Sequence, residues 1–349
     1  MRVNYHGRPC FFPAVLTRLL RRLLLLLLVA AAVAAGALGW WVTQPLALSG
    51  DTVEVRVPAG ASLRTAARQA ARAGVRAPAD LLYAYFRWKV EPQQTIKPGD
   101  YEVTRGMTAG DLLDKLVRGD RIMLPVTLVE GWTFKQVRQA LAQAEHLAHD
   151  TAAMTPAEIM GALGRPGVAP EGRFFPDTYL YAKDSGELAV LREALQLMDK
   201  RLAAAWDARA PGLPLKSPDE ALVLASLVEK ETGQAADRPE IAGVFINRLR
   251  IGMRLQTDPS VIYGLGDAFD GNLRRRDLTA DTPFNTYTRA GLPPTPIAMP
   301  GKASLMAAVQ PADTKALYFV ARGDGSSHFS PTLDEHNRAV NKYQRGGGN

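Results

Sequence analysis

The sequence has few of the side chains that build metal and redox sites. Its 349 residues include one cysteine, Cys10, so no disulfide can form within the chain and a cysteine-based metal or redox site is excluded. His328 and His336 are the only histidines among the last two hundred residues, and neither belongs to a zinc-binding spacing such as HExxH. The sequence also lacks a P-loop and a GxGxxG stretch. We therefore expect no metal and no cofactor.

Acidic residues are missing from the first fifty positions, since the first one is Asp51. The same region contains five arginines: Arg2, Arg8, Arg18, Arg21 and Arg22. The next twenty residues carry no charge and are long enough, as a helix, to cross a hydrocarbon core of about 30 Å. Positive charge before such a segment keeps the N-terminus in the cytoplasm. We predict a cytoplasmic basic tail over 1–22, a single transmembrane helix over 23–43 ending near the interfacial Trp40 and Trp41, and an exported body.

A cleaved signal peptide is the alternative interpretation of this leader, although the apolar region of a signal peptide is usually shorter. Outside the leader the charges balance. Without its five arginines, 37 of the 42 basic residues remain against 35 acidic residues, a net charge of about +2. Proteins that bind nucleic acid usually carry a strong basic excess. Nucleic acid is therefore not an expected partner.

Three stretches of the exported part share one pattern. Each alternates apolar and polar residues as a strand, turns at a glycine and continues as an amphipathic helix. The stretches start at Val53, Tyr101 and Val126, and the expected N-caps of their helices are Ser62, Thr108 and Thr133. Units of this kind pack as α+β layers. Two interpretations fit: ordinary structural units, or a compact carbohydrate-binding module close to the membrane.

The second half of the chain predicts further helices. An aromatic-rich segment over 171–186 is a loop or short strand, and a long helix follows over 188–208. A proline-bearing linker over 211–220 leads into a helix that contains LASLVEKETG, with Ser217 or Asp219 as its N-cap.

The remaining elements are marked by their ends. One helix ends at Gly252, and another is expected to begin with Asp258 as N-cap and Pro259 at N1. A strand ALYFVA, a turn at GDGSS and a strand around His328 come next. The closing helix begins with a capping box between Thr332 and Glu335, and the terminal GGGN is expected to fray.

Two glutamates of LASLVEKETG are separated by helical geometry. At about 100° per residue, Leu224, Leu227, Val228 and Glu231 share one face, so Glu231 continues an apolar stripe. Burial disfavours the charged form of a carboxyl group and raises its pKa, as a general acid requires. Glu231 is therefore a candidate catalytic group. Glu229 is expected on the polar side of the helix, in solvent.

Each polar residue near Glu231 has a structural interpretation as well. Glu231 could lie beyond the buried part of its helix and pair with Arg248 or Arg254. Ser226 and Lys230 are one helical turn apart, but a penicillin-recognising enzyme needs SxxK rather than SxxxK, so both are expected to be surface residues.

The loop over 281–301 has an unusual composition. Asn285, Thr286 and Tyr287 supply amide, hydroxyl and phenol groups, while Pro293, Pro294, Pro296 and Pro300 stiffen the backbone. Polar groups beside an aromatic face suit a sugar. The structural alternative is a surface loop whose prolines limit the entropy of the unfolded chain.

Several of these segments together resemble one known family. LASLVEKETG, VFINRLRIGMRLQTDPSVIYGLG, FNTYTRAGLPPTPIAMPG, LYFVARGDG and EHNRAV, with LVEGWTF and EGRFFPDTYLY upstream, are similar to the YceG-like endolytic murein transglycosylases. The resemblance covers nearly all of the exported chain. It implies an inner-membrane protein with a periplasmic body, a LysM-like subdomain over 51–122 and a YceG-like catalytic domain over 124–345, an α+β fold.

The resemblance also implies a reaction, the non-hydrolytic cleavage of the MurNAc–GlcNAc bond inside glycan strands with formation of 1,6-anhydro-MurNAc ends. By motif position the catalytic residue is Glu231, acting as general acid and then as base. Residues expected to position the sugars are Gln256, Asp258, Tyr263, Asn285 and Tyr287, whereas Asn247 and Arg248 are expected to be structural. Peptidoglycan synthases (penicillin-binding proteins) are expected partners. The alternative function is a membrane-anchored, glycan-binding scaffold without enzymatic activity.

Overall fold

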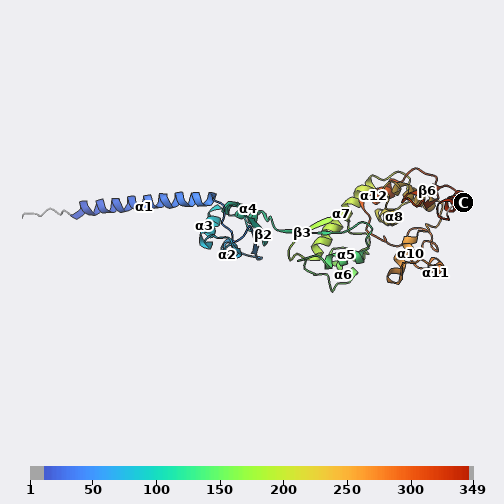
Figure 1. Cartoon of the computed structure of the whole chain (residues 1–349), viewed down its shortest axis with the longest axis horizontal. Coiled ribbons are helices and arrows are strands. Elements are labelled where there is room, and N and C mark those ends of the chain that lie inside the picture. The colour runs from blue at the N-terminus through green and yellow to red at the C-terminus, as the bar shows by residue number, and fades with distance from the viewer. Residues whose placement is uncertain (1–11, 346–349) are drawn as a thin grey trace, which may run out of the picture. The chain divides into compact units, whose positions relative to one another are not determined.

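The computed structural model describes residues 12–345 and divides the chain into two compact units, with the boundary between Ile122 and Met123 (Figure 1). Cys10, the first half of the predicted cytoplasmic tail and the terminal GGGN lie outside the described residues. Both units contain helices and strands, so the fold is mixed α+β. Within the described residues the strands form three separate two-stranded antiparallel sheets.

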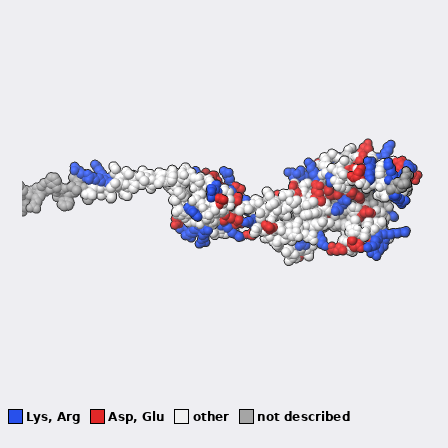
Figure 2. Space-filling model, in the orientation of Figure 1, with Lys and Arg blue, Asp and Glu red and all other residues white. Residues whose placement is uncertain are grey.

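The first unit begins with a long apolar helix, α1 (Phe12–Thr43). Its segment Arg18–Thr43 has 26 residues and a mean hydropathy of 2.5, and none of its most apolar window is buried inside the protein. At 1.5 Å per residue it exceeds the roughly 30 Å hydrocarbon core of a bilayer. On the face shown in Figure 2, basic side chains gather at the N-terminal end of this helix. These properties are compatible with the predicted single membrane span.

A small α+β layer follows α1. Its elements are β1 (Thr52–Val57), α2 (Leu63–Ala73), α3 (Ala79–Lys89), β2 (Gly99–Thr104) and α4 (Ala109–Arg118). Strands β1 and β2 pair from Thr52↔Thr104 to Val57↔Gly99. Alternate residues of both strands point into a core that includes Val55, Phe86, Tyr101 and Leu112. The sequence missed α3, whose aromatic-rich stretch has no N-cap side chain to mark its start.

The second unit contains two hydrophobic core clusters. Its first half comprises β3 (Met123–Thr127), α5 (Phe134–Ala142), α6 (Pro156–Ala162), β4 (Thr178–Ala182) and α7 (Glu187–Asp207). The sequence left the aromatic-rich segment over 171–186 as either a loop or a short strand. It contains the short strand β4, which pairs with β3 from Met123↔Ala182 to Thr127↔Thr178. The predicted long helix is confirmed as α7, while α6 was not predicted.

The remaining elements surround one central helix, α8 (Pro218–Glu231). They are α9 (Arg238–Arg250), α10 (Asp258–Leu265), the 3₁₀ turn η1 (Gly266–Ala268), α11 (Arg275–Thr279), α12 (Lys302–Val309), β5 (Tyr318–Ala321), β6 (Ser327–Ser330) and α13 (Leu333–Tyr343). Helix α8 contacts α7, α9, α10 and α12, and every residue from Ala221 to Val228 is buried. This packing leaves only the two ends of α8 near the surface.

The helix ends test the predicted caps. The hydroxyls of Ser62, Thr108, Thr133, Ser217 and Thr332 each accept a backbone N–H of the first turn, which confirms those caps and selects Ser217 over Asp219. The cap predicted at Asp258 is wrong. Thr257 occupies the N-cap position and Asp258 lies inside α10, because the Thr257 hydroxyl donates to Glu231 and the Asp258 carboxylate accepts from Tyr287.

The burial of α8 makes its core residues sensitive to truncation. Leu227 is fully buried, so Leu227→Ala is expected to lower the free energy of unfolding by about 2–5 kcal/mol through lost apolar contacts and a cavity. The matched control is Leu180→Ala on β4, where the side chain is 56% exposed and the expected change is within about 0.5 kcal/mol. Urea denaturation of the detergent-solubilised chain measures both. Equal changes in the two variants would contradict the packing described for α8.

Candidate active site

The last residue of α8, Glu231, lines a cavity of about 380 Å³ in the second unit. Its other walls come from α9, the segment that leads into α10, the proline-rich loop, β5 and α13. The lining residues are Arg248, Gln256, Asp258, Tyr287, Tyr318, Phe319, Leu333 and His336. Segments separated by more than one hundred positions thus meet around one carboxyl group.

Glu231 is half-buried, and its surroundings favour the protonated form. Loss of hydration raises the pKa of Glu231 to about 7, and the neighbouring Asp258 carboxylate adds to the increase. The Thr257 hydroxyl donates a hydrogen bond to Glu231 Oε1, and this bond together with the Arg248 charge opposes the increase. Glu231 therefore holds a proton near neutral pH and can release it.

The alternative ion pair of Glu231 with an arginine is not what the structure shows. Arg248 donates its Nε to Leu317 O at 2.7 Å and its Nη1 to Leu255 O at 2.6 Å, and Arg254 donates to Tyr287 O at 3.0 Å. Among residues 12–345 neither arginine lies within ion-pair distance of the Glu231 carboxylate. Arg248 acts at longer range, as a buried positive charge on the cavity wall.

Aromatic groups form the opposite wall of the cavity. The rings of Tyr318 and His336 stack with centroids 5.3 Å apart, and the Arg248 guanidinium lies 5.3 Å from the Tyr318 centroid. The Tyr287 hydroxyl donates to Asp258 Oδ1 at 2.5 Å. Flat faces beside paired polar groups suit a sugar ring, which has an apolar face and a polar rim.

The structure brings together three of the five predicted sugar-positioning residues with Glu231: Gln256, Asp258 and Tyr287. The other two lie elsewhere. Tyr263 donates its hydroxyl to Glu171 Oε2 at 3.1 Å and lines two neighbouring cavities of about 740 and 680 Å³. Tyr263 lies in the second turn of α10 and does not line the Glu231 cavity. Its ring packs against Phe284, with the two ring centroids 4.8 Å apart.

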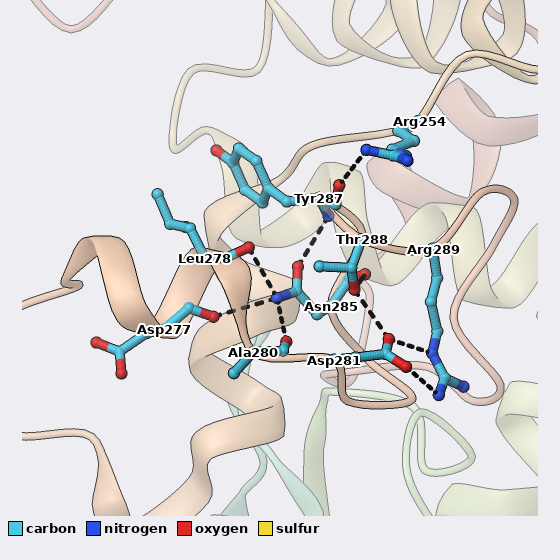
Figure 3. Close-up of polar contacts among 9 residues, drawn as sticks. All are labelled: Arg254, Asp277, Leu278, Ala280, Asp281, Asn285, Tyr287, Thr288 and Arg289. Atoms are coloured by element: carbon cyan, nitrogen blue, oxygen red, sulfur yellow. Dashed lines mark hydrogen bonds and ion pairs between the residues drawn. The ribbon is translucent and has the colours of Figure 1, made fainter.

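Asn285 has a structural role instead (Figure 3). It is 1% exposed, and its Nδ2 donates to the carbonyls of Asp277, Leu278 and Ala280 at 3.1, 3.1 and 2.6 Å. Its Oδ1 accepts the Tyr287 N–H at 2.9 Å. Asn285 thus closes the end of α11 and fixes the backbone of Tyr287, which itself reaches the cavity.

The prediction that Glu229 and Ser226 lie on a solvent-exposed side of α8 is wrong. The Glu229 side chain is 6% exposed; its Oε2 accepts the Gly301 N–H at 2.9 Å, and its Oε1 lies 3.5 Å from Arg238 Nη2. Ser226 is fully buried, donates to Val223 O at 2.7 Å and accepts the Ile297 N–H at 3.0 Å. The proline-rich loop covers the face that was expected in solvent, and these two side chains hold it there. Lys230 is exposed as expected.

Several cavity residues were not predicted as site residues, although Tyr318, Phe319 and His336 lie in the segments LYFVARGDG and EHNRAV that carry the family resemblance. Tyr318, Phe319, Leu333 and His336 come from a strand and a helix that are read as ordinary secondary structure. Arg248 was expected to be structural, and its hydrogen bonds are, yet it also lines the cavity. Asn247 is structural, since its Nδ2 donates to the carbonyls of Thr314 and Ala316 at 2.8 and 3.1 Å.

Comparison with known proteins identifies the family. The YceG-like family matches residues 55–342, so the chain belongs to the YceG-like family. It is 30% identical over 312 residues to a Bacillus subtilis protein named endolytic murein transglycosylase, covering 84% of this chain and 86% of that one. A Streptococcus pneumoniae protein of the same name is 26% identical over 325 residues, which span 83% of this chain and 58% of the relative.

The fold agrees with this assignment. A crystal structure of a yceG-like protein from Listeria monocytogenes aligns with 82% of this chain and 98% of its own, at a TM-score of 0.52 and 29% identity.

The buried serine contacts give a test of how the loop is held. Ser226→Ala leaves the Ile297 N–H without its acceptor and is expected to lower the free energy of unfolding by about 1–3 kcal/mol. Ser304 is a matched control, because it is equally buried but its hydroxyl has no hydrogen-bond partner within the described part of the chain, so Ser304→Ala is expected to be neutral or slightly stabilising. Denaturation curves for both variants measure the difference. A neutral Ser226→Ala would show that its hydrogen bonds do not hold the loop.

Proposed function

We propose that this protein is an endolytic murein transglycosylase that uses Glu231 as its only catalytic acid and base. The observation that carries the proposal is a carboxyl group with a pKa of about 7 in a cavity with aromatic and polar walls. The names of the Bacillus and Streptococcus relatives support the substrate class, murein glycan.

In the proposed reaction Glu231 first protonates the glycosidic oxygen between MurNAc and GlcNAc. The C6 hydroxyl of MurNAc then attacks C1 and loses its proton to the Glu231 carboxylate, which restores the acid and leaves a 1,6-anhydro-MurNAc end. Because the attacking oxygen belongs to the sugar, no second carboxylate is needed to activate water or to form a covalent intermediate. Gln256, Asp258 and Tyr287 are proposed to position the sugars, and Tyr263 and Asn285 to support the cavity through their neighbours.

The cavity contains a second carboxylate, Asp258, and this permits a competing mechanism. An inverting or retaining hydrolase uses two carboxylates and releases a reducing end. Asp258 accepts the Tyr287 hydroxyl and raises the pKa of Glu231. We assign it a supporting role, and the products distinguish the two mechanisms.

The proposal includes a cellular location and a membrane topology. Helix α1 is proposed to anchor the protein in the inner membrane with its N-terminus in the cytoplasm, so that both units meet nascent glycan in the periplasm. The segment 51–122 is proposed to be a LysM-like glycan-binding module. A transglycosylase anchored in the membrane would act beside peptidoglycan synthases, which are its proposed partners. Crosslinking in intact membranes tests that partnership, and recovery of the anchored protein without any synthase would contradict it.

Product analysis tests the reaction itself. Murein strands digested with the purified protein are expected to yield fragments with 1,6-anhydro-MurNAc ends by mass spectrometry. Glu231→Gln is expected to lower the rate by about 10²–10⁴-fold, the usual contribution of a general acid–base group. Reducing MurNAc ends would indicate a hydrolase that uses Asp258. Undiminished cleavage by Glu231→Gln would remove Glu231 from the mechanism, and a wild-type protein that binds glycan without cutting it would favour a scaffold.

The pH dependence follows from the pKa of Glu231. Since the acid must be protonated in the free enzyme, kcat/KM is expected to fall about tenfold per pH unit above about pH 7. The Asp258 carboxylate raises this pKa, so Asp258→Asn is expected to move the alkaline limb to lower pH. The profile of kcat/KM from pH 5 to 9 measures both. A limb that moves to higher pH in Asp258→Asn would contradict the assignment of that limb to Glu231.

A further inference from the structure

Thr257 is held in one position by three of its own groups. It is 1% exposed and lies between the cavity residues Gln256 and Asp258. Its backbone N–H donates to Thr286 Oγ1 at 3.0 Å, and its carbonyl accepts the Ser260 hydroxyl at 2.8 Å. Its own hydroxyl donates to Glu231 Oε1. The residue therefore links helix α8 to the start of α10 and to the proline-rich loop.

The partners of Thr257 are themselves buried and fixed. Ser260 and Thr286 are 0% and 2% exposed, and their hydroxyl oxygens lie 2.9 Å apart. The preceding Gln256 has φ +50°, a left-handed backbone that a residue other than glycine rarely adopts, and its N–H donates to Thr286 O at 3.1 Å. These contacts fix the backbone of Thr257 beside Glu231.

We propose that Thr257 is a positioning residue that places the acidic proton of Glu231 on Oε2. A protonated carboxyl group carries one O–H and one C=O, and the C=O oxygen is the one that accepts a donated hydrogen. Because the Thr257 hydroxyl donates to Oε1, the proton belongs on Oε2. Among residues 12–345 the structure places no hydrogen-bond donor on Oε2.

This inference rests on the proposed function and specifies which atom performs it. In the first step the Oε2–H bond breaks while an O–H bond forms on the glycosidic oxygen, whose bond to C1 breaks. In the second step the C6 oxygen bonds to C1, and its proton returns to Oε2. Oε2 thus loses one proton and regains one, while Oε1 keeps its hydrogen bond to Thr257 throughout.

The Thr257 bond also sets the acidity of Glu231. A donated hydrogen stabilises the carboxylate, so the bond lowers the pKa, as does the Arg248 guanidinium of α9. Desolvation and the Asp258 carboxylate raise it. The other titratable groups on the cavity wall are Tyr287 of the loop, Tyr318 of β5 and His336 of α13. Loss of the Thr257 hydroxyl is therefore expected to make Glu231 a weaker acid, opposite to the effect of removing Asp258.

The test compares Thr257→Val, which has the same shape without the hydroxyl, with Thr257→Ser, which retains it. The full chain in detergent is assayed on murein strands from pH 5 to 9. In Thr257→Val the alkaline limb of kcat/KM is expected to move up by about one pH unit, because a charge-assisted hydrogen bond gives the carboxylate a roughly tenfold preference. Its kcat is expected to fall, since the proton is no longer directed to Oε2. Thr257→Ser is expected to keep the wild-type limb.

Two further variants separate this role from folding. Thr257→Ala removes the same hydroxyl without adding a second methyl group, so it is expected to show the same shift if Thr257→Val does not fold. Thr178→Val removes a hydroxyl from the exposed Thr127–Thr178 pair of the β3–β4 sheet and is expected to leave the profile unchanged. A loss of activity without a shifted limb would overturn the inference and leave Thr257 a structural residue. Activity that survives Glu231→Gln would instead overturn the proposed function.

Discussion

The site depends on one energetically costly placement, a carboxyl group at the end of a helix whose middle turns, Ala221 to Val228, are completely buried. Raising the pKa of Glu231 from 4.5 to about 7 corresponds to roughly 3 kcal/mol of preference for the protonated form. The pKa of this group is higher in the folded state than in the unfolded chain. The free energy of unfolding therefore falls as the pH rises from 4.5 to about 7, and the full loss is present above pH 7. The surrounding core must therefore be strong enough to hold a group that neutral solution would hydrate. The close packing of α8 against α7, α9, α10 and α12 supplies that strength.

The same helix also organises the loop that completes the cavity. Ser226 and Glu229 hold the backbone of Ile297 and Gly301, at the end of the loop that contributes Tyr287. Asn285 fixes the other end of that loop through carbonyls at the end of α11 and just after it. Three polar side chains of α8 thus have separate roles: two hold the loop, and the third, Glu231, faces the space that the loop encloses. The loop's prolines limit its freedom before any of these contacts form.

The sequence predicted the elements that have strong local signals. The three strand–helix units and the caps at Ser62, Thr108 and Thr133 depend on neighbouring residues alone, and the structure contains them. Helical periodicity also selected Glu231, but it failed for Ser226 and Glu229 because it assumes a helix with one buried face. The aromatic wall of the cavity, Tyr318 and His336, depends on how distant segments pack, which no local pattern contains. For the same reason the motif containing Tyr263 did not reveal that its ring lies in a different cavity.

A raised pKa alone does not identify the catalytic acid, since Glu171 has one as well. Burial raises the pKa of Glu171 to about 7, yet its Oε1 accepts the Phe134 N–H at 3.0 Å, its Oε2 accepts the Tyr263 hydroxyl, and the Gly172 N–H is a third donor. With a donor on each oxygen, neither oxygen of Glu171 is left to present a proton to a ligand, and the two bonds tie α5 to α10. Among residues 12–345, Glu231 has a single donor, Thr257, on Oε1, so its other oxygen can meet a substrate without the loss of any hydrogen bond to those residues. Occupancy of the two oxygens, more than acidity, therefore separates a carboxyl group that holds the fold together from one that is placed to react.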